Sequence, residues 1–253
     1  MQVSIKYTTL FILLLTCYSS FSSAKGRDAN DELIFAPKKF YFSNDFDGAL
    51  LSTALQTQSP AGPGNVGTPR FSYFWNGGFN VNYDFSKVIG LFSGLSVKNI
   101  GFIEKSAVKA DSTIKRRVYT IGVPLGIKIG NLKKKQYIFI GGGVDFPFNY
   151  KEKGYIVRNN KEKFNEWFSD RTPRTMPYGF VGFSVKGFYV KAQYYPSNFM
   201  NPDYIATTNS VTLPVVKPYA AYDVQLLVFS IGFDIRYGQK MKITPKSKED
   251  PVM

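Results

Sequence analysis

Eight charged residues stand at alternate positions of strongly patterned segments, and their side chains could form ion pairs with one another. The acidic members are Asp45, Asp47, Asp145 and Asp234, and the basic members are Lys98, Lys128, Lys191 and Arg236. If these side chains share an enclosed space, an unpaired charge there would cost several kcal/mol, so acids and bases should balance. We expect a structural network of paired charges. A narrow ion path along the same residues and a catalytic pair are the alternatives.

The residue types that are missing restrict the chemistry further. The chain has no histidine and a single cysteine, Cys17. Absence of histidine removes Ser-His and Cys-His catalysis and nearly all structural zinc sites, and one cysteine cannot form an intrachain disulfide. We therefore expect no enzymatic activity, no cofactor and no metal site.

The segment that must position Lys128 shows the pattern most clearly. Residues 119–130 read YTIGVPLGIKIG, with large apolar residues at every odd position and small or polar residues at every even position. A period of two over twelve residues predicts a β-strand with two different faces. About 9–11 tilted residues of strand cross a bilayer, so this strand is long enough to do so.

The same alternation recurs along the chain. A mean hydropathy of −0.15 argues against membrane-spanning helices, whereas half of each strand in a membrane barrel is polar. Aromatic residues near the strand ends, such as Tyr83, Tyr119 and Tyr194, fit interfacial girdles. We expect eight strands, at residues 39–51, 71–85, 88–101, 119–130, 136–150, 179–185, 188–194 and 225–237.

The connections between these segments alternate in length. Residues 52–70, 102–113, 151–177 and 196–221 are long connections, and residues 86–87, 131–135 and 186–187 are short. An even strand number with short periplasmic turns and long external loops is typical of outer-membrane barrels. We predict an all-β fold, an eight-stranded antiparallel up-and-down transmembrane β-barrel with apolar faces toward lipid and charged faces inside. A soluble periplasmic barrel, with apolar faces inward around a ligand, is the alternative.

We expect the segments at both ends of the chain to lie outside the barrel. Lys6, the apolar run at residues 10–15 and the small residues before position 25 are typical of a secretory signal peptide. We predict a signal peptide at residues 1–24, a periplasmic leader at 25–38, the barrel at 39–237 and a disordered periplasmic tail at 238–253. The predicted location is the bacterial outer membrane.

The long connection at residues 151–177 is the main candidate for external interactions. Phe164, Trp167 and Phe168 are spaced i, i+3 and i+4, which predicts a short amphipathic helix within residues 160–170. A lid on the barrel mouth, a helix lying among lipid headgroups and a partner-docking surface remain alternatives. The candidate interaction residues are Arg158, Phe164, Trp167, Phe168, Arg171 and Arg174.

The formal net charge of +14 favours an anionic partner. Outer-membrane lipid and lipopolysaccharide phosphates fit this charge. Nucleic acid does not fit an exported protein. Another envelope or secretion protein is a further candidate partner.

Three stretches in order along the chain resemble landmarks of a known family. GLSVKNIGF at residues 94–102, YTIGVPLGIKIG at 119–130 and FYVKAQYYPSNFMN at 188–201 are similar to the third, fourth and seventh strands of the Bacteroidota outer-membrane β-barrel domain family, which includes PorT-like proteins. The third stretch has Pro196-Ser197 where the family has Gly-Leu. The resemblance implies an eight-stranded barrel over roughly residues 39–237.

These observations favour an integral outer-membrane barrel without catalytic activity, with a structural, surface-interaction or secretion and assembly role. The resemblance links one family branch to type IX secretion but does not assign that role here. A narrow, porin-like channel and the soluble ligand-binding barrel are the competing functions.

Overall fold

The computed structural model describes residues 31–35, 39–58, 69–72, 76–105, 113–156, 160–206, 216–237 and 241–245. The chain divides into two units, and the larger one comprises residues 36–239. Within the described residues no helix is long and apolar enough to cross a membrane, and that finding has no bearing on strands.

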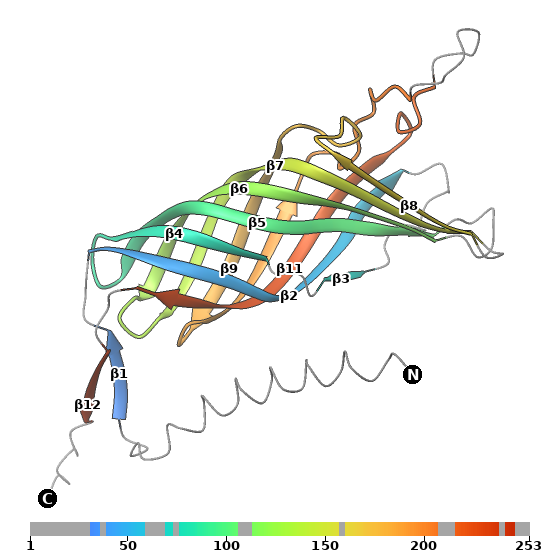
Figure 1. Ribbon diagram of the computed structural model, residues 1–253. Coiled ribbons are helices and arrows are strands. Elements are labelled where there is room, and N and C mark those ends of the chain that lie inside the picture. Colours follow the sequence, from blue (N-terminus) through green and yellow to red (C-terminus); the bar gives the residue numbers. More distant parts are fainter. Residues whose placement is uncertain are drawn as a thin grey trace, which may run out of the picture. The chain divides into compact units, whose positions relative to one another are not determined.

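The larger unit is built from strands that alternate between two faces (Figure 1). Ten strands belong to it: β2 (Phe40–Gln58), β3 (Arg70–Ser72), β4 (Asn76–Asp84), β5 (Ile89–Lys105), β6 (Thr113–Asn131), β7 (Gln136–Ile156), β8 (Asn160–Trp167), β9 (Met176–Val185), β10 (Phe188–Tyr195) and β11 (Asp223–Arg236).

Eight of these strands form a closed antiparallel ring. The order is β2-β4-β5-β6-β7-β9-β10-β11, and β11 pairs back onto β2 from Arg236 and Ser43 to Asp223 and Gln58. The short β3 pairs with β2 beyond β4, and β8 pairs only with β7. Because the ring closes, it leaves no open edge among its strands. The prediction of an eight-stranded antiparallel barrel is confirmed.

Short and long connections alternate around the ring, as predicted. Two of the short ones are Leu132–Lys135 and the turn Lys186–Gly187, whose residues both have positive φ, of 53° and 96°. Two positive φ values suit a tight hairpin turn that follows the twist of the strands, and glycine takes up such a φ without strain. These turns define the short-turn end of the barrel, and the opposite end is the long-loop end.

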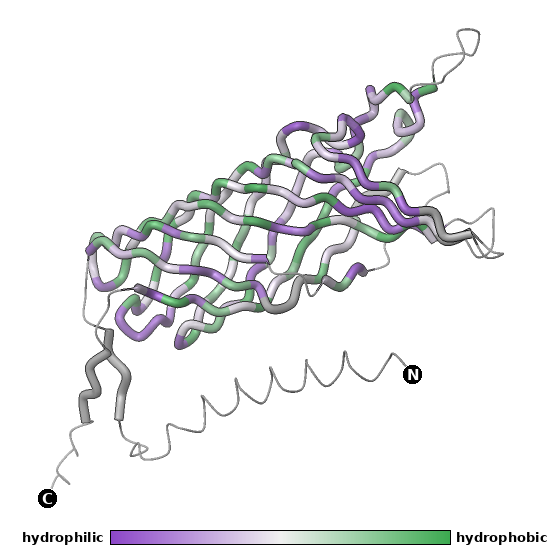
Figure 2. The backbone as a smooth tube through the Cα atoms, viewed as in Figure 1, coloured by the Kyte–Doolittle hydropathy of each residue, from purple (hydrophilic) through white to green (hydrophobic). Residues whose placement is uncertain are grey.

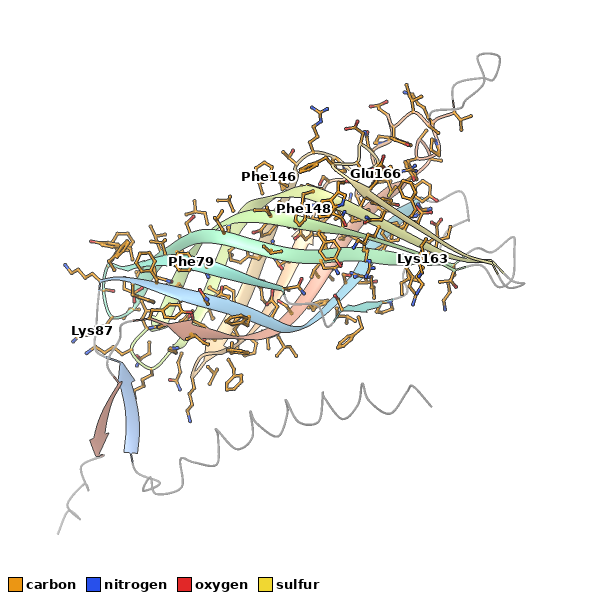
Figure 3. All side chains as sticks on the ribbon, viewed as in Figure 1. Phe79, Lys87, Phe146, Phe148, Lys163 and Glu166 are labelled. Atoms are coloured by element: carbon orange, nitrogen blue, oxygen red, sulfur yellow. The ribbon has the colours of Figure 1, made fainter. Side chains whose placement is uncertain are left out.

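The alternation seen in the sequence sorts side chains between the outside and the inside. On β6 the odd residues Ile121–Ile129 are 43–62% exposed, whereas Thr120 and Lys128 are buried. Figure 2 shows the same alternation of hydropathy on the neighbouring strands. Phe79, Phe146 and Phe148 lie on the outer surface in Figure 3.

One irregularity changes this alternation on β7. Tyr119 pairs with Asn149 and Thr120 pairs with Pro147, so Phe148 is an extra residue, a β-bulge. Below the bulge even residues such as Ile140 are exposed, and above it the even residue Tyr150 is buried. A one-residue shift exchanges the two faces of a strand, so the bulge reverses which residues point outward.

The strands β5, β6 and β7 extend further toward the long-loop end than the sequence predicts. β5 and β6 remain paired up to Lys105 and Thr113, and β6 and β7 up to Thr113 and Tyr155. Figure 1 shows β5, β6, β7 and β8 continuing together at the long-loop end. We call this region the rim extension: residues 99–105, 113–119, 149–156 and 160–167.

The smaller unit is described by two strands that pair with each other. β1 (Asp31–Phe35) is antiparallel to β12 (Met241–Pro245). These residues belong to the segments predicted as a leader and as a disordered tail. At residues 241–245 the structure has a strand instead. The predicted signal peptide at 1–24 lies outside the described residues.

A disulfide across the β11–β2 contact tests the closure of the ring. Phe229 and Leu51 are direct partners there, and Cβ atoms of opposed strand residues lie about 4.5–5.5 Å apart, close to disulfide geometry. In a Cys17→Ser background, Phe229→Cys combined with Leu51→Cys should oxidise to an internal disulfide, seen as a gel-mobility shift that reductant reverses. Phe229→Cys with Leu125→Cys, on non-adjacent strands, is the control. No shift in the first pair would mean an open sheet.

Candidate functional site

The interior at the short-turn end holds a first cluster of charges around Lys128. Its ammonium group lies 2.8 Å from a carboxylate oxygen of Asp84. It also donates hydrogen bonds to Tyr41 Oη at 2.7 Å and to Asn82 Oδ1 at 3.0 Å. Lys128 is buried, so these contacts replace the water that the ammonium group would otherwise bind.

Arg236 and Asp234, both on β11, form a second cluster beside it. Arg236 Nε lies 3.3 Å from Asp234 Oδ2, and its Nη1 donates to the Leu132 carbonyl oxygen at 3.0 Å. Lys135, in the turn between β6 and β7, donates to the Asp234 carbonyl oxygen at 2.9 Å. The turn is therefore attached to the end of β11 through two cations.

The middle of the barrel contains Asp47, Lys191 and Asp45. Asp47 accepts a hydrogen bond from Tyr189 at 2.8 Å and lies 3.4 Å from Lys191 Nζ. Asp45 accepts a hydrogen bond from Asn80 at 2.5 Å. These three charged side chains line a cavity of about 60 Å³.

Lys98 and Asp145 form the most deeply buried ion pair of the described residues. Their side chains are 3% and 0% exposed, and Lys98 Nζ lies 2.9 Å from Asp145 Oδ1. Asp145 also accepts hydrogen bonds from Tyr195 at 2.7 Å and Thr120 at 3.2 Å. Lys98 lies 3.6 Å from the centre of the Tyr178 ring, close enough for a cation–π contact.

The structure brings together three pairs among the eight charges singled out from the sequence: Lys98 with Asp145, Lys191 with Asp47, and Arg236 with Asp234. The other two, Lys128 and Asp45, contact Asp84 and Asn80 instead. Two further charges join the clusters, Asp84 and Lys135, so five acids face five bases. Asp84 could have been found from its place on the polar face of its segment. Lys135 could not, because a turn lysine is ordinarily solvated.

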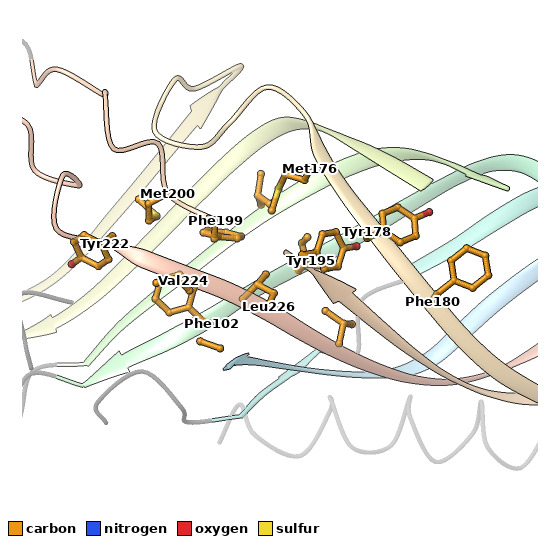
Figure 4. Close-up of a cluster of buried hydrophobic side chains, with 14 of the residues drawn as sticks. Phe102, Met176, Tyr178, Phe180, Tyr195, Phe199, Met200, Tyr222, Val224 and Leu226 are labelled. Carbon is orange, nitrogen blue, oxygen red and sulfur yellow. The ribbon is translucent and has the colours of Figure 1, made fainter. Parts of the chain in front are cut away.

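The interior changes character toward the long-loop end, where apolar and aromatic side chains replace the charges (Figure 4). Phe199 and Met200, from the connection between β10 and β11, are fully buried there. Phe199 packs edge-on against Phe102, with ring centres 5.3 Å apart. Val224 and Leu226 belong to the same cluster. We call it the apolar plug: Ile100, Phe102, Val118, Met176, Phe199, Met200, Val224 and Leu226.

The sequence analysis missed the apolar plug. Residues 196–206 show no alternation, because this segment folds back into the barrel as an irregular chain. Asn198 holds it there: its Oδ1 accepts hydrogen bonds from the backbone nitrogens of Met200 at 3.2 Å and Val224 at 3.0 Å. The signal available in the sequence was an adjacent pair of large apolar residues, Phe199 and Met200, within a long connection.

A further charged cluster lies beyond the plug, on the inner face of the rim extension. Arg116 contacts Glu152 at 2.7 Å and Glu104 at 3.1 Å. Tyr150 and Tyr222 also accept hydrogen bonds from the Arg116 guanidinium at 3.3 and 3.2 Å. This cluster connects β6, β7, β5 and the chain entering β11.

The predicted amphipathic helix is wrong. Residues 160–167 form strand β8, paired with β7 from Trp167 and Asn149 to Asn160 and Ile156. An isolated helix of this length is marginal in water, whereas pairing with the extended β7 satisfies the backbone of β8. In a strand Phe164 and Trp167 point to opposite faces, so they do not form the single apolar stripe that the helix required.

The predicted loop residues therefore have separate roles. Arg171 lies over the Phe164 ring at 4.3 Å and contacts Glu166 at 3.2 Å, on the inner side of β8. Trp167 stacks on Phe148 with ring centres 6.0 Å apart, on the outer side. Phe168 is 78% exposed, with φ of 51°. Arg174, also exposed, contacts Asp170 at 3.8 Å. Arg158 lies outside the described residues.

Arg171 keeps its positive charge despite partial burial. Burial disfavours the charged form, but hydrogen bonding to Tyr219 and Glu166 outweighs it, so the pKa of Arg171 lies above its ordinary value. The Arg171–Tyr219 hydrogen bond measures 2.9 Å. Arg171 therefore joins the segment after β8 to the connection that precedes β11. Within the described ranges no group of three metal-ligating side chains occurs.

Comparisons with known proteins do not assign a family. No protein-family model matches the sequence, and no curated protein does. Ail, the attachment invasion locus protein of Yersinia pestis, in complex with the heparin analogue sucrose octasulfate, aligns with a TM-score of 0.31 and 13% identity over 78% of this chain and 97% of that chain.

A second solved structure, the N-terminal β-barrel domain of Pseudomonas aeruginosa OprF, aligns with a TM-score of 0.25 and 9% identity over 75% of this chain and 99% of that chain. Likeness at these TM-scores carries no argument about binding or activity. The resemblance to the Bacteroidota family stays a prediction.

The Lys98–Asp145 pair gives a direct test of the charged interior. Lys98→Met should lower the free energy of unfolding by about 3–5 kcal/mol, because it leaves the Asp145 carboxylate buried without its cation. Adding Asp145→Asn removes that uncompensated charge and keeps an acceptor for Tyr195 and Thr120, so the double variant should recover part of the loss. Urea unfolding in detergent micelles or vesicles measures both. Additive effects of the two substitutions would contradict the pairing.

Proposed function

We propose that this protein is an integral outer-membrane β-barrel with a filled interior, which acts through its long-loop end and catalyses no reaction. The observation that carries the proposal is a band of exposed apolar side chains on the outside of all eight ring strands. Three members are Phe42 on β2, Ile140 on β7 and Ile231 on β11, at 41%, 53% and 59% exposed.

The band has the height that a membrane needs. On β6 the outward residues from Tyr119 to Ile129 are aromatic or aliphatic without interruption. These ten residue steps cover about 33 Å along a strand, or about 25 Å of height at a tilt of roughly 40°. Soluble monomers rarely expose contiguous apolar patches beyond a few hundred Å², whereas lipid is the natural neighbour of a continuous band.

The two sides of the sheet exclude the reverse arrangement. A soluble barrel around an apolar ligand would need apolar faces inside and charges outside. Here the charged side chains of Lys98, Lys128 and Asp145 are buried, and the aliphatic ones are exposed. The predicted soluble alternative is therefore not favoured.

The long-loop end is the part that we assign to function. It carries the rim extension and the irregular connection before β11. The connections at this end differ from the short turns in both length and charge. Surface interaction, or a role as a partner in secretion or assembly, fits an exposed sheet that projects beyond the barrel. Lipid, lipopolysaccharide or another envelope protein are the partners that we propose, with residues 1–24 as the export signal.

The effect of a charge placed in the apolar band distinguishes a membrane-embedded barrel from a soluble one. Leu125 is 62% exposed at the middle of β6, and Leu125→Lys should destabilise a lipid-embedded barrel by about 2–4 kcal/mol. A soluble barrel would tolerate the change. The measurements are the yield of the outer-membrane fraction and the gel mobility of unboiled samples, in which a folded barrel migrates faster than the boiled chain.

Gln136→Lys is the matched control, because Gln136 is exposed at the short-turn end of the neighbouring strand β7, outside the band. It should behave as the wild type does. A wild-type chain found in the soluble fraction, or equal behaviour of both variants, would contradict the membrane assignment.

The narrow-channel alternative is tested by conductance in planar bilayers. The apolar plug and the ion-paired clusters occupy the interior, so the wild-type protein should show no steady single-channel current. Phe199→Ala combined with Met200→Ala, which removes the two plug residues supplied by the loop, serves as the comparison. Steady wild-type currents that vary with salt concentration would favour the channel.

A further inference from the structure

The outer face of the rim extension carries an unusual density of positive charge. Lys115 and Arg117 on β6, Lys151 and Lys153 on β7, and Lys163 on β8 share this face. Figure 2 shows hydrophilic residues gathered along these strand ends, and Lys163 is labelled in Figure 3. We call these five residues the cationic strip.

The strand register arranges the strip in two rows. Lys153 lies directly opposite Lys115 on one side and directly opposite Lys163 on the other. In the next row Arg117 lies opposite Lys151. Neighbouring strands are about 4.8 Å apart, so the row of three lysines spans only about 10 Å. Like charges directly opposite each other disfavour a sheet, and a bound anion offsets that repulsion.

In the described part of the rim extension, the acidic side chains lie on the other face. Glu104 and Glu152 contact Arg116 on the inner side, and Glu166 contacts Arg171 there. The bulge at Phe148 produces this separation on β7, because it places Lys151 and Lys153 outward and Glu152 inward. The charges are therefore sorted by sign: the glutamates contact arginines on the inner face, and the five basic residues of the cationic strip lie on the outer face.

The position of the cationic strip relative to the apolar band indicates which layer of the membrane the strip contacts. An aromatic row lies immediately below the cationic strip. In this row Phe148 stacks on Trp167, and the ring centres of Phe148 and Tyr119 are 6.3 Å apart. Lys151 Nζ lies 5.1 Å from the centre of the Tyr119 ring, which joins the row to the strip. Aromatic side chains mark the boundary between hydrocarbon and headgroups.

The height of the two rows matches the headgroup layer. Each two-residue step along a tilted strand adds about 5 Å of height, so the rows lie about 5 and 10 Å above the aromatic row. The polar layer on each side of the hydrocarbon core is about 5–7 Å thick. Arg117 and Lys151 are thus at headgroup depth, with Lys115, Lys153 and Lys163 just above them.

We propose that the cationic strip binds the phosphate groups of a phosphorylated glycolipid of the lipid A class in the outer leaflet. The proposal rests on the outer-membrane function argued above. The aromatic row contacts the acyl chains at their upper end, and the two cationic rows contact the phosphates. A lipid-bound anion fits better than a soluble one, because the strip continues directly from the lipid-facing surface of the same strands.

The test compares lipid-dependent stability in reconstituted vesicles. The chain, expressed from its full sequence and purified in detergent, is reconstituted into phosphatidylcholine vesicles with no additive, with diphosphorylated lipid A, or with dephosphorylated lipid A. The temperature at which the folded gel band disappears is measured in each. A ligand that binds the folded state raises this temperature. The wild-type protein should gain stability from diphosphorylated lipid A only.

The variant Lys115→Gln/Lys153→Gln/Lys163→Gln should keep its melting temperature in phosphatidylcholine and lose most of the gain. Loss of three charge contacts at the surface corresponds to a weakening of lipid A binding by about tenfold or more. The control Lys87→Gln/Lys133→Gln/Lys186→Gln removes equal charge at the short-turn end and should keep the full gain.

The outcomes separate this proposal from the proposed function. If the wild-type chain gives no folded band in any vesicle, the membrane barrel itself is wrong. If all variants fold and gain equally from lipid A, only the phosphate site is wrong. If soluble heparin in phosphatidylcholine vesicles reproduces the wild-type gain and the strip variant abolishes it, while lipid A has no effect, the strip binds a soluble polyanion and the lipid assignment is overturned.

Discussion

Hydrogen bonding of the strand backbone is the constraint on which the rest of this structure depends. Each ring strand must satisfy its N–H and C=O groups on both sides, and only closure through β11 and β2 completes this for all eight. Closure with eight strands fixes a narrow interior that side chains must fill. The outer face can then carry apolar residues, and the inner face carries the residues at the alternate positions of each strand.

What fills the interior follows from that geometry. Near the short turns, half of each strand is polar and the side chains neutralise one another, as Lys128 and Asp84 do. Toward the long-loop end, residues from outside the strands must fill the interior. Phe199 and Met200 do so because their segment is long enough to fold back inward. The two halves of the interior differ chemically: one holds compensated charges beside the packed rings of Phe92, Phe139 and Phe180, and the other holds the apolar plug.

The sequence predicts most of the barrel because a period of two is a local property. YTIGVPLGIKIG displays both faces of β6 without reference to any other strand, and the same holds for the polar positions that hold Asp45 and Lys128. The pairing of those charges is not local: Lys128 reaches Asp84 over Gly90 of the intervening strand β5, and Lys135 reaches Asp234 from a turn. The bulge at Phe148 and the strand at residues 160–167 depend on register with a neighbour, so the local helical spacing of Phe164 and Trp167 was misleading.

The bulge at Phe148 also has a consequence for how such a barrel can vary. On β7, one additional residue exchanges the two faces of the strand, so that above it Lys151 and Lys153 lie outward and Glu152 lies inward. A rim of any length can then be added above it, provided that residues are inserted in twos. An odd insertion would turn the lysines inward and the glutamates outward. The alternation of the rim extension therefore depends on the number of residues inserted above the bulge, whereas the eight strands below it keep their own pattern.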